Sequence, residues 1–185
     1  MTGASLPRAE IFTSIGVIEV ELDVKAAPLG ARNFLKYIDE GRFEGATFYR
    51  TMRQEHWTPG RELQLIQGGL GGDQSRALPP IAHESGQQTG LRHLKGALSY
   101  ARGAPGTAGS EFFICLADCP GLDPTESPVP PADGLGYAVF GRVVSGMAVV
   151  EKIHASETLA EAPIELLRGQ LIKQPVTIVG TRRAR

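Results

Sequence analysis

The sequence has few cysteines, no excess of charge of one sign and no long apolar run, and each absence excludes a class of protein. Its 185 residues include 2 cysteines, so a disulfide framework does not hold the fold together. Lys and Arg total 19 against 20 Asp and Glu, which removes the usual electrostatic basis for binding nucleic acid or an anionic membrane. No apolar run approaches a bilayer span, and residues 1–10 lack the hydrophobic region of a signal peptide. We therefore expect a cytoplasmic chain, or a periplasmic one if a signal peptide has been removed.

Several motifs that would indicate other chemistries are incomplete. GGLGGD at 68–73 precedes neither Gly-Lys-Ser/Thr nor the start of a helix, so it does not read as a phosphate-binding loop. Ser110 lies outside any Gly-x-Ser-x-Gly elbow, and Cys115 sits in an apolar run without a neighbouring histidine, which favours simple burial over a reactive thiol. The histidines lack the paired spacing of metal ligands, so we expect no metal site.

The chain contains many short β-rich runs and few helical ones. Helices are predicted over 147–155 and from Pro28, which suits a first helical turn, to just before Gly41, which suits a left-handed C-terminal cap. Because the strands do not alternate with helices, as a parallel sheet would require, an antiparallel barrel or sandwich is favoured. The predicted strands form a hairpin over 9–22 and continue at 46–52, 63–69, 96–102, 110–117, 137–144 and 175–181.

All 185 residues are expected to form one domain, because 42% hydrophobic composition is enough for one substantial core. Two of its loops are long, at about 52–64 and 120–136, and the second is too rich in proline to continue a strand. The chain ends in a small basic cluster that we expect to be solvated, formed by Arg182, Arg183 and Arg185.

The segment GSEFFICLAD, residues 109–118, combines a carboxylate, two phenylalanines and a cysteine in one predicted strand. Side chains alternate between the faces of a strand, so one wholly apolar face belongs to the core. The other carries a charge beside an exposed aromatic ring, which indicates a surface that meets a ligand. The ligand face holds Glu111, Phe113 and Cys115, and the core face holds Phe112, Ile114 and Leu116.

Four stretches stand out together: FYR at 48–50, LIQGG at 65–69, SYARGAPGTAGSEFFI at 99–114 and GYAVFGRVVSGM at 136–147. At these residues the chain resembles the cyclophilins, and the likeness runs from the first hairpin to the last strand. GLRHLKGALSYAR and GYAVFGRVV are most similar to the bacterial branch. The resemblance implies a mainly β fold, a closed eight-stranded antiparallel barrel capped by two α-helices, and peptidyl-prolyl cis/trans isomerase activity in protein folding.

The resemblance also implies roles for single residues. It makes Arg50 the catalytic arginine, Gln67 a neighbour that helps orient it, and Phe113 a wall of the proline pocket. The implied partners are unfolded or flexible protein segments containing X-Pro, bound by a monomer without metal, organic cofactor, nucleic acid or membrane. The further substrate-binding positions are Leu65, Glu111, Leu122 and Tyr137, together with Ala101, Arg102 and Gly103 along the substrate backbone.

This chemistry needs a fixed cation and an apolar clamp. Rotation about an X-Pro amide meets a barrier of roughly 20 kcal/mol and takes tens to hundreds of seconds unaided. A guanidinium such as that of Arg50 can stabilise the twisted amide by donating to the prolyl nitrogen or to the carbonyl group in a water-poor groove. Phe113, with its apolar neighbours, would hold the pyrrolidine ring while the preceding carbonyl turns.

Two departures from the family pattern concern the site directly. Glu111 stands where the family commonly has glutamine; it could pair with Arg50, orienting the guanidinium but neutralising part of its charge, or it could turn to solvent. Gln64 stands at the usual pocket phenylalanine, and Trp57 in the preceding loop is a candidate for the missing aromatic wall, the alternative being an anchor for that loop. A second reading of the chain is therefore a binding module for Pro-containing segments with little turnover.

Gly121 and Tyr137 take the places of a tryptophan and a histidine found in many eukaryotic members. That tryptophan is associated with tight cyclosporin binding, so weak or absent cyclosporin binding is expected. Tyr137 can still close the pocket with its ring. The Pro-rich segment between Leu122 and Tyr137 is either a rim or occupant of the groove or a loosely packed surface loop.

Overall fold

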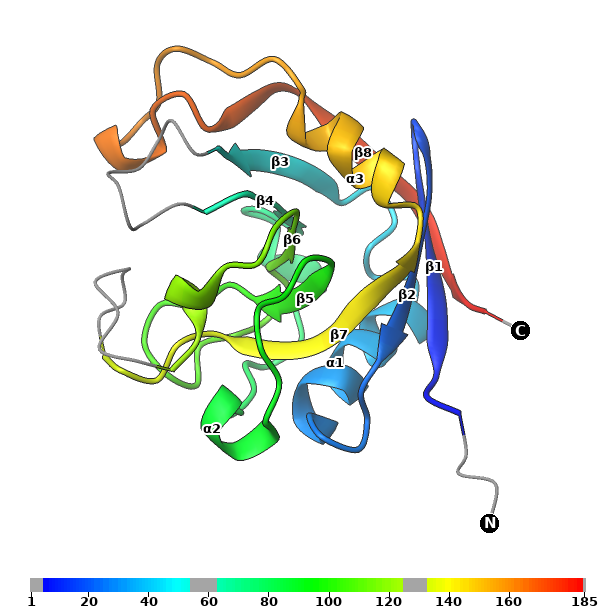
Figure 1. Cartoon of the computed structure of the whole chain (residues 1–185). Helices are drawn as coiled ribbons and strands as arrows, with labels where there is room; N and C mark the ends of the chain where they lie inside the picture. Colours follow the sequence, from blue (N-terminus) through cyan, green and yellow to red (C-terminus); the bar gives the residue numbers. More distant parts are fainter. Residues whose placement is uncertain (1–4, 54–62, 125–132, 185) are drawn as a thin grey trace.

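The computed structural model describes residues 5–53, 63–124 and 133–184, and in it eight strands close into one antiparallel barrel (Figure 1). Their order around the barrel is β1-β2-β7-β5-β6-β4-β3-β8. Each strand pairs on both sides, so the barrel leaves no unpaired edge, and the predicted fold class is confirmed. The strands are β1 (Arg8–Thr13), β2 (Gly16–Leu22), β3 (Thr47–Met52), β4 (Leu65–Gly69), β5 (Ala97–Tyr100), β6 (Phe112–Cys115), β7 (Ala138–Ser145) and β8 (Leu171–Arg183).

The two predicted helices are α1 (Pro28–Asp39) and α3 (Met147–His154). Proline opens α1, and Gly41 follows its end with a φ of 63°, a left-handed conformation that favours glycine. A further helix of four residues, α2 (Gly86–Thr89), was not predicted. In the described part of the chain no helix is both long and apolar enough to cross a membrane. Short 3₁₀ turns are η2 (Gln74–Arg76), η3 (Pro120–Leu122) and η4 (Glu165–Leu167).

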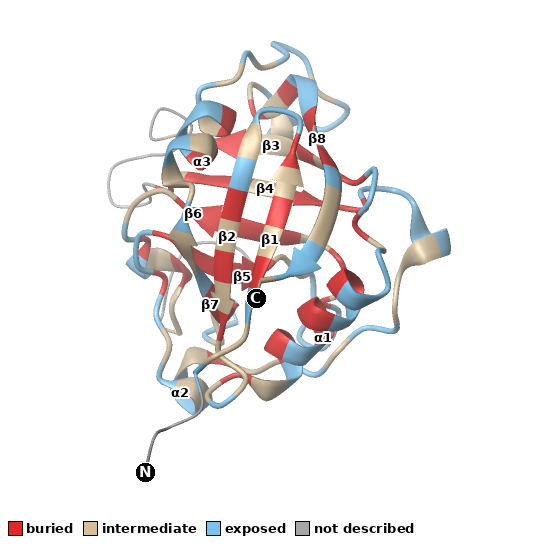
Figure 2. Cartoon of the chain, turned by 90° about the vertical axis from the view of Figure 1, so that its right-hand side faces the viewer, coloured by how far each residue is buried: buried red, intermediate tan, exposed pale blue. Residues whose placement is uncertain are grey.

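Strand β6 contributes to two apolar clusters, because its successive side chains point alternately to its two faces, as predicted. Phe112 and Ile114 point into the main core, where the Phe112 ring lies 5.1 Å from that of Phe34 on α1. Phe113 and Cys115 belong to a second cluster on the opposite face. The expectation of an exposed ring on that face was wrong, because Phe113 is only 3% exposed. Figure 2 shows buried positions along the strands through the depth of the barrel.

A β-bulge in β3 decides where two neighbouring side chains point. Phe48 pairs with Gly68 of β4, but the next pair along the strands is Arg50 with Gln67, so Tyr49 is an extra residue in the ladder. Successive residues of a regular strand face opposite ways, whereas a bulge re-aims them. Tyr49 and Arg50 can therefore both reach the side chain of Gln67.

Strand β8 is longer than predicted and uses the basic end of the chain. It spans Leu171–Arg183 and passes through Pro175, which lies where the register against β3 shifts, so its missing N–H removes no regular ladder bond. Arg182 and Arg183 are exposed, as expected, and each also pairs with an acid at the surface, while Arg185 lies outside the described residues. Arg182 pairs with Glu10 at 2.5 Å and Arg183 with Asp39 at 2.6 Å.

Candidate active site

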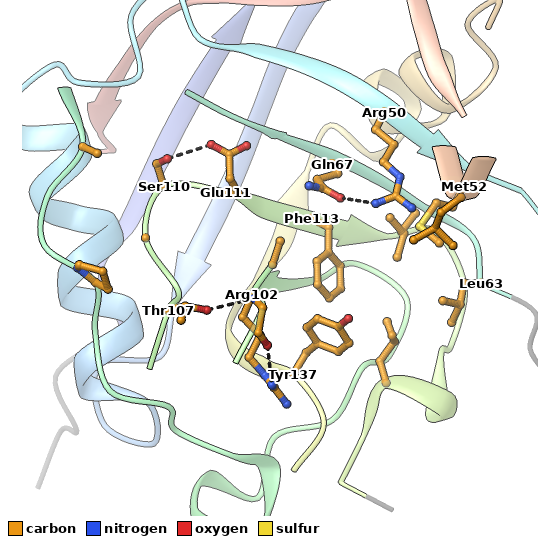
Figure 3. A pocket seen from close by; sticks show the side chains of 18 of the residues that line it. Arg50, Met52, Leu63, Gln67, Arg102, Thr107, Ser110, Glu111, Phe113 and Tyr137 are labelled. Atoms are coloured by element: carbon orange, nitrogen blue, oxygen red, sulfur yellow. Dashed lines mark hydrogen bonds between the residues drawn. The ribbon is translucent and has the colours of Figure 1, made fainter. Parts of the chain in front are cut away.

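One cavity of about 660 Å³ opens at the side of the barrel where β3, β4 and β6 meet the loop around residues 101–110, Leu122 and Tyr137 (Figure 3). The structure brings together around it every predicted site residue that it describes. Trp57 lies outside the described residues. The lining includes Arg50, Leu65, Gln67, Ala101, Arg102, Gly103, Glu111, Phe113, Leu122 and Tyr137.

The apolar part of the cavity is centred on Phe113. The ring of Tyr137 meets the Phe113 ring edge-on at 5.6 Å between centroids, which is a favourable aromatic geometry. Among the wall residues missed from the sequence are Met52 at the end of β3 and Leu63 just before β4, and both belong to the same buried cluster as Phe113. Gln64 provides no aromatic ring for this wall. Among the described residues, aliphatic side chains therefore form it. Met52 and Leu63 could have been noticed as large apolar residues flanking the FYR and LIQGG motifs.

Arg50 is held by two glutamine side chains. The Nε and Nη2 groups donate to Oε1 of Gln170 at 2.9 and 2.7 Å, and Nη1 donates to Oε1 of Gln67 at 3.2 Å. A guanidinium has five N–H groups, so among the described residues these three hydrogen bonds leave two that can donate to a substrate. Gln170 was missed from the sequence; it precedes β8, and only the pairing of β3 with β8 brings it beside Arg50.

The charge of Arg50 is largely buried, and no acid among the described residues pairs with it. Burial lowers the pKa of the guanidinium below its ordinary value, but an arginine side chain stays protonated in proteins. Within the described part of the chain its side-chain hydrogen bonds go to neutral amides and to no carboxylate. A cation in such a place acts more strongly on a nearby dipole than it would in water.

Glu111 neither pairs with Arg50 nor turns to solvent. Its Oε2 accepts a hydrogen bond from the Tyr49 hydroxyl at 2.5 Å, and its Oε1 accepts from the Ser110 hydroxyl at 2.9 Å and the Gly71 N–H at 3.0 Å. Both alternatives considered for this residue are therefore replaced by a third, in which the carboxylate is fixed inside the groove wall.

Arg102 fastens the loop that carries Tyr137. Its guanidinium makes a two-pronged pair with Asp133 at 2.8 and 2.9 Å and donates to the carbonyl of Gly136. It also lies 5.4 Å from the centre of the Tyr137 ring. The end of the loop predicted over 120–136 is thus bonded to the groove. Residues 125–132 of this loop lie outside the described residues.

His93 supports Phe113 from behind. Its ring is parallel to that of Phe113, with centroids 5.8 Å apart, and is 1% exposed. Nδ1 lies 2.8 Å from Asp123 Oδ1 and Nε2 lies 2.9 Å from the Ser99 hydroxyl. A neutral ring that donates from Nδ1 and accepts at Nε2 satisfies both partners. Because Ser99 is fully buried, this Ser-His-Asp arrangement has no access to a substrate and is structural.

We expect His93 to make folding stability fall on mild acidification. Burial lowers the pKa of its ring below the ordinary value of 6.5, although Asp123 opposes the shift, so the unfolded chain binds the proton more readily. The contribution of the neutral His93 ring to the free energy of unfolding is thus fully present above pH 6.5. It declines as the pH falls below that value, by up to about 1 kcal/mol per pH unit. Urea unfolding at pH 7.5 and 5.5 should show a smaller pH difference in His93→Asn. An unchanged difference would contradict the assignment.

A closed barrel whose side carries an apolar pocket beside a largely buried arginine, bonded to neutral amides among the described residues, is the arrangement expected of a cyclophilin-type isomerase. The family described as "Cyclophilin type peptidyl-prolyl cis-trans isomerase/CLD" matches residues 8–182. The chain belongs to this family of isomerases, as the sequence motifs predicted.

Bacterial relatives and solved structures agree with this. The chain is 37% identical over 175 residues to "Peptidyl-prolyl cis-trans isomerase A" of Dickeya dadantii, covering 89% of this chain and 84% of that one. It is 32% identical over 177 residues to a peptidyl-prolyl cis-trans isomerase of Acinetobacter baylyi, covering 94% and 83%. A Cryptosporidium parvum cyclophilin-type isomerase, crystallised in the presence of the dipeptide Ala-Pro, shares the fold with a TM-score of 0.72 at 19% identity, over 96% of this chain and 99% of that one.

Proposed function

We propose that this chain, acting as a monomer, isomerises X-Pro bonds in unfolded or flexible protein segments, with Arg50 as the catalytic residue. The observation that carries the proposal is the setting of Arg50, a largely buried charge on the wall of the cavity that also contains Phe113, bonded among the described residues to two neutral amides. A charge held in this way needs no reorganisation when the reacting amide changes its charge distribution.

The geometry suggests how the reaction would run. The proline ring would sit against Phe113, Leu122 and Tyr137, while the preceding carbonyl turns beside Arg50 in the same cavity. Twisting the amide breaks its resonance and leaves an electron pair on the prolyl nitrogen. The free N–H groups of Arg50 can donate to that nitrogen, or to the carbonyl group, more strongly in the twisted state than in either planar state, and this difference lowers the barrier. No covalent bond is made or broken.

NMR exchange spectroscopy on a short X-Pro peptide tests the proposal. With a catalytic amount of the full chain, the cis and trans resonances should exchange far faster than the unaided rate of once in tens to hundreds of seconds. Peptide binding without accelerated exchange would instead support the alternative of a binding module. Neither binding nor exchange would exclude both.

Cyclosporin is expected to bind weakly or not at all. Gly121 precedes Leu122 in η3 and offers no ring at the position where many eukaryotic members have tryptophan. Aromatic side chains supply much of the buried area at such sites, so its absence should weaken binding. Titration calorimetry of the parent chain and of Gly121→Trp checks this, with stronger binding expected in the variant. Sub-micromolar affinity of the parent chain would contradict the expectation.

A further inference from the structure

A chain of hydrogen bonds joins Glu111 to Arg50 without direct contact between them. The Tyr49 hydroxyl donates to Glu111 Oε2 at 2.5 Å, the Gln67 Nε2 donates to the Tyr49 oxygen at 2.9 Å, and Arg50 Nη1 donates to Gln67 Oε1 at 3.2 Å. The bulge in β3 makes this possible, because it lets two consecutive residues reach the same glutamine. Figure 3 shows the Gln67 side chain beside the Arg50 guanidinium, with the hydrogen bond between them dashed.

The ionised carboxylate sets the direction of every bond in this chain. A carboxylate can only accept hydrogen bonds, so the Tyr49 hydroxyl must donate its one hydrogen to Glu111. Its oxygen can then only accept, which requires the amide nitrogen of Gln67 to face it. The amide oxygen of Gln67 is left facing Arg50, the one orientation in which it can accept from a guanidinium.

The Tyr49 hydroxyl keeps its proton in this position. Burial raises the pKa of Tyr49, and the negative charge of Glu111 together with the hydrogen bond to it raises the pKa further. The hydroxyl therefore remains a donor throughout the neutral range, and the direction of the chain does not reverse there.

The surroundings of Glu111 are built to hold its carboxylate. The N–H of Gly71 and the hydroxyl of Ser110 both donate to Oε1, which gives the GGLGGD segment a use that its sequence did not reveal. Gly69 lies so close that a Cβ added there would stand 2.8 Å from Glu111 Oε1 and 2.6 Å from the Ser110 carbonyl oxygen. Only glycine leaves room for the carboxylate at this point.

We infer that Glu111 is a positioning residue for the catalytic arginine, acting through Tyr49 and Gln67 to keep one acceptor aimed at the Arg50 guanidinium. The inference rests on the proposed function. With glutamine at 111, the side chain could either donate to or accept from Tyr49, and the amide of Gln67 could then turn its own N–H groups toward Arg50. A donor facing a buried cation loses the hydrogen bond and leaves the guanidinium less well fixed.

The test compares Glu111→Gln, Tyr49→Phe and the double variant with the parent chain, using the exchange assay to separate kcat from KM. Each single variant should lower kcat about fivefold with little change in KM, because a fixed orientation matters in the twisted state. The double variant should be no worse than either single one, since both changes break the same chain. A shift of the Gln67 side-chain amide resonances should accompany each single variant.

Glu84→Gln is the matched control. Glu84 also accepts two backbone N–H hydrogen bonds, from Leu29 and Gly30, but it lies at the start of α1, away from the cavity lining. We expect that variant to change stability and to leave kcat as in the parent. Unchanged kcat in both single variants, an effect on KM alone, or single effects that multiply in the double variant would overturn the inference. Absence of catalysis in the parent chain would instead overturn the proposed function.

Discussion

Replacing Arg50 with alanine is expected to lower kcat/KM by about 100- to 1000-fold, the usual cost of removing one preorganised donor from a transition state. The substitution removes the guanidinium from the cavity wall, and with it the positive charge that is bonded to Gln67 and Gln170. The interactions of the guanidinium with the amide strengthen as the amide twists, so kcat should fall more than KM rises. Exchange spectroscopy on an X-Pro peptide measures the two constants.

Two further arginine variants make this result specific. Arg142→Ala removes a cation from β7 whose side chain is 66% exposed and paired with Glu21, and it should leave the rate unchanged. Arg50→Lys keeps a positive charge but cannot reach both glutamines in the same fixed geometry, so most of the loss should remain. Full activity in Arg50→Ala would show that another group carries the reaction.

Replacing Phe113 with alanine is expected to damage both the site and the fold. Phe113 is 3% exposed and belongs to the cluster beneath the cavity, where its ring is flanked by His93 and Tyr137. Truncation of a buried phenylalanine costs about 3–5 kcal/mol of unfolding free energy. Losing the ring against which proline would bind should also lower kcat/KM by at least about tenfold, since one aromatic contact contributes upwards of 1 kcal/mol. Urea unfolding and the exchange assay measure the two effects.

Phe112→Leu separates stability from activity, because Phe112 is the next residue of β6 but faces the main core. That variant should lose about 1–2 kcal/mol of stability and keep its activity per folded molecule. If Phe112→Leu and Phe113→Ala lowered activity equally at matched stability, the two faces of β6 would not have the separate roles assigned to them.

Much of the fold could be predicted because it depends on local pattern. Hydrophobic alternation marked the strands to within a few residues, Pro28 and Gly41 marked the ends of the first helix, and the order of the motifs identified the family. The placement of the predicted site residues around one cavity agrees with that identification. Their individual roles remain predictions, to be decided by the variants above.

Alternation also assigned Phe112 and Phe113 to opposite faces of β6. The sequence predicted correctly which way each ring points, but the expectation that the Phe113 ring is exposed was wrong. A strand pattern tells which side chains share a face, but it does not tell what covers that face. The cover comes from Leu63, which precedes β4, and from Cys119 and Leu122, which follow the end of β6 and fold back over this face. A face that looked open from the strand alone is therefore buried.

The sequence by itself determined the barrel class, the family and the residue types of the site, because each is written in short stretches of neighbouring residues. Only the tertiary structure decided how the arginine is held. Gln170 reaches Arg50 across 120 positions of sequence, through the pairing of β3 with β8. The bulge at Tyr49 could not be predicted either, since it arises from the register between two strands. For the same reason the hydrogen-bond partner of Glu111 could not be predicted from the sequence, since a hydrogen bond depends on where two distant strands place their atoms. The barrel places Tyr49 between Glu111 and Gln67, the glutamine that faces Arg50.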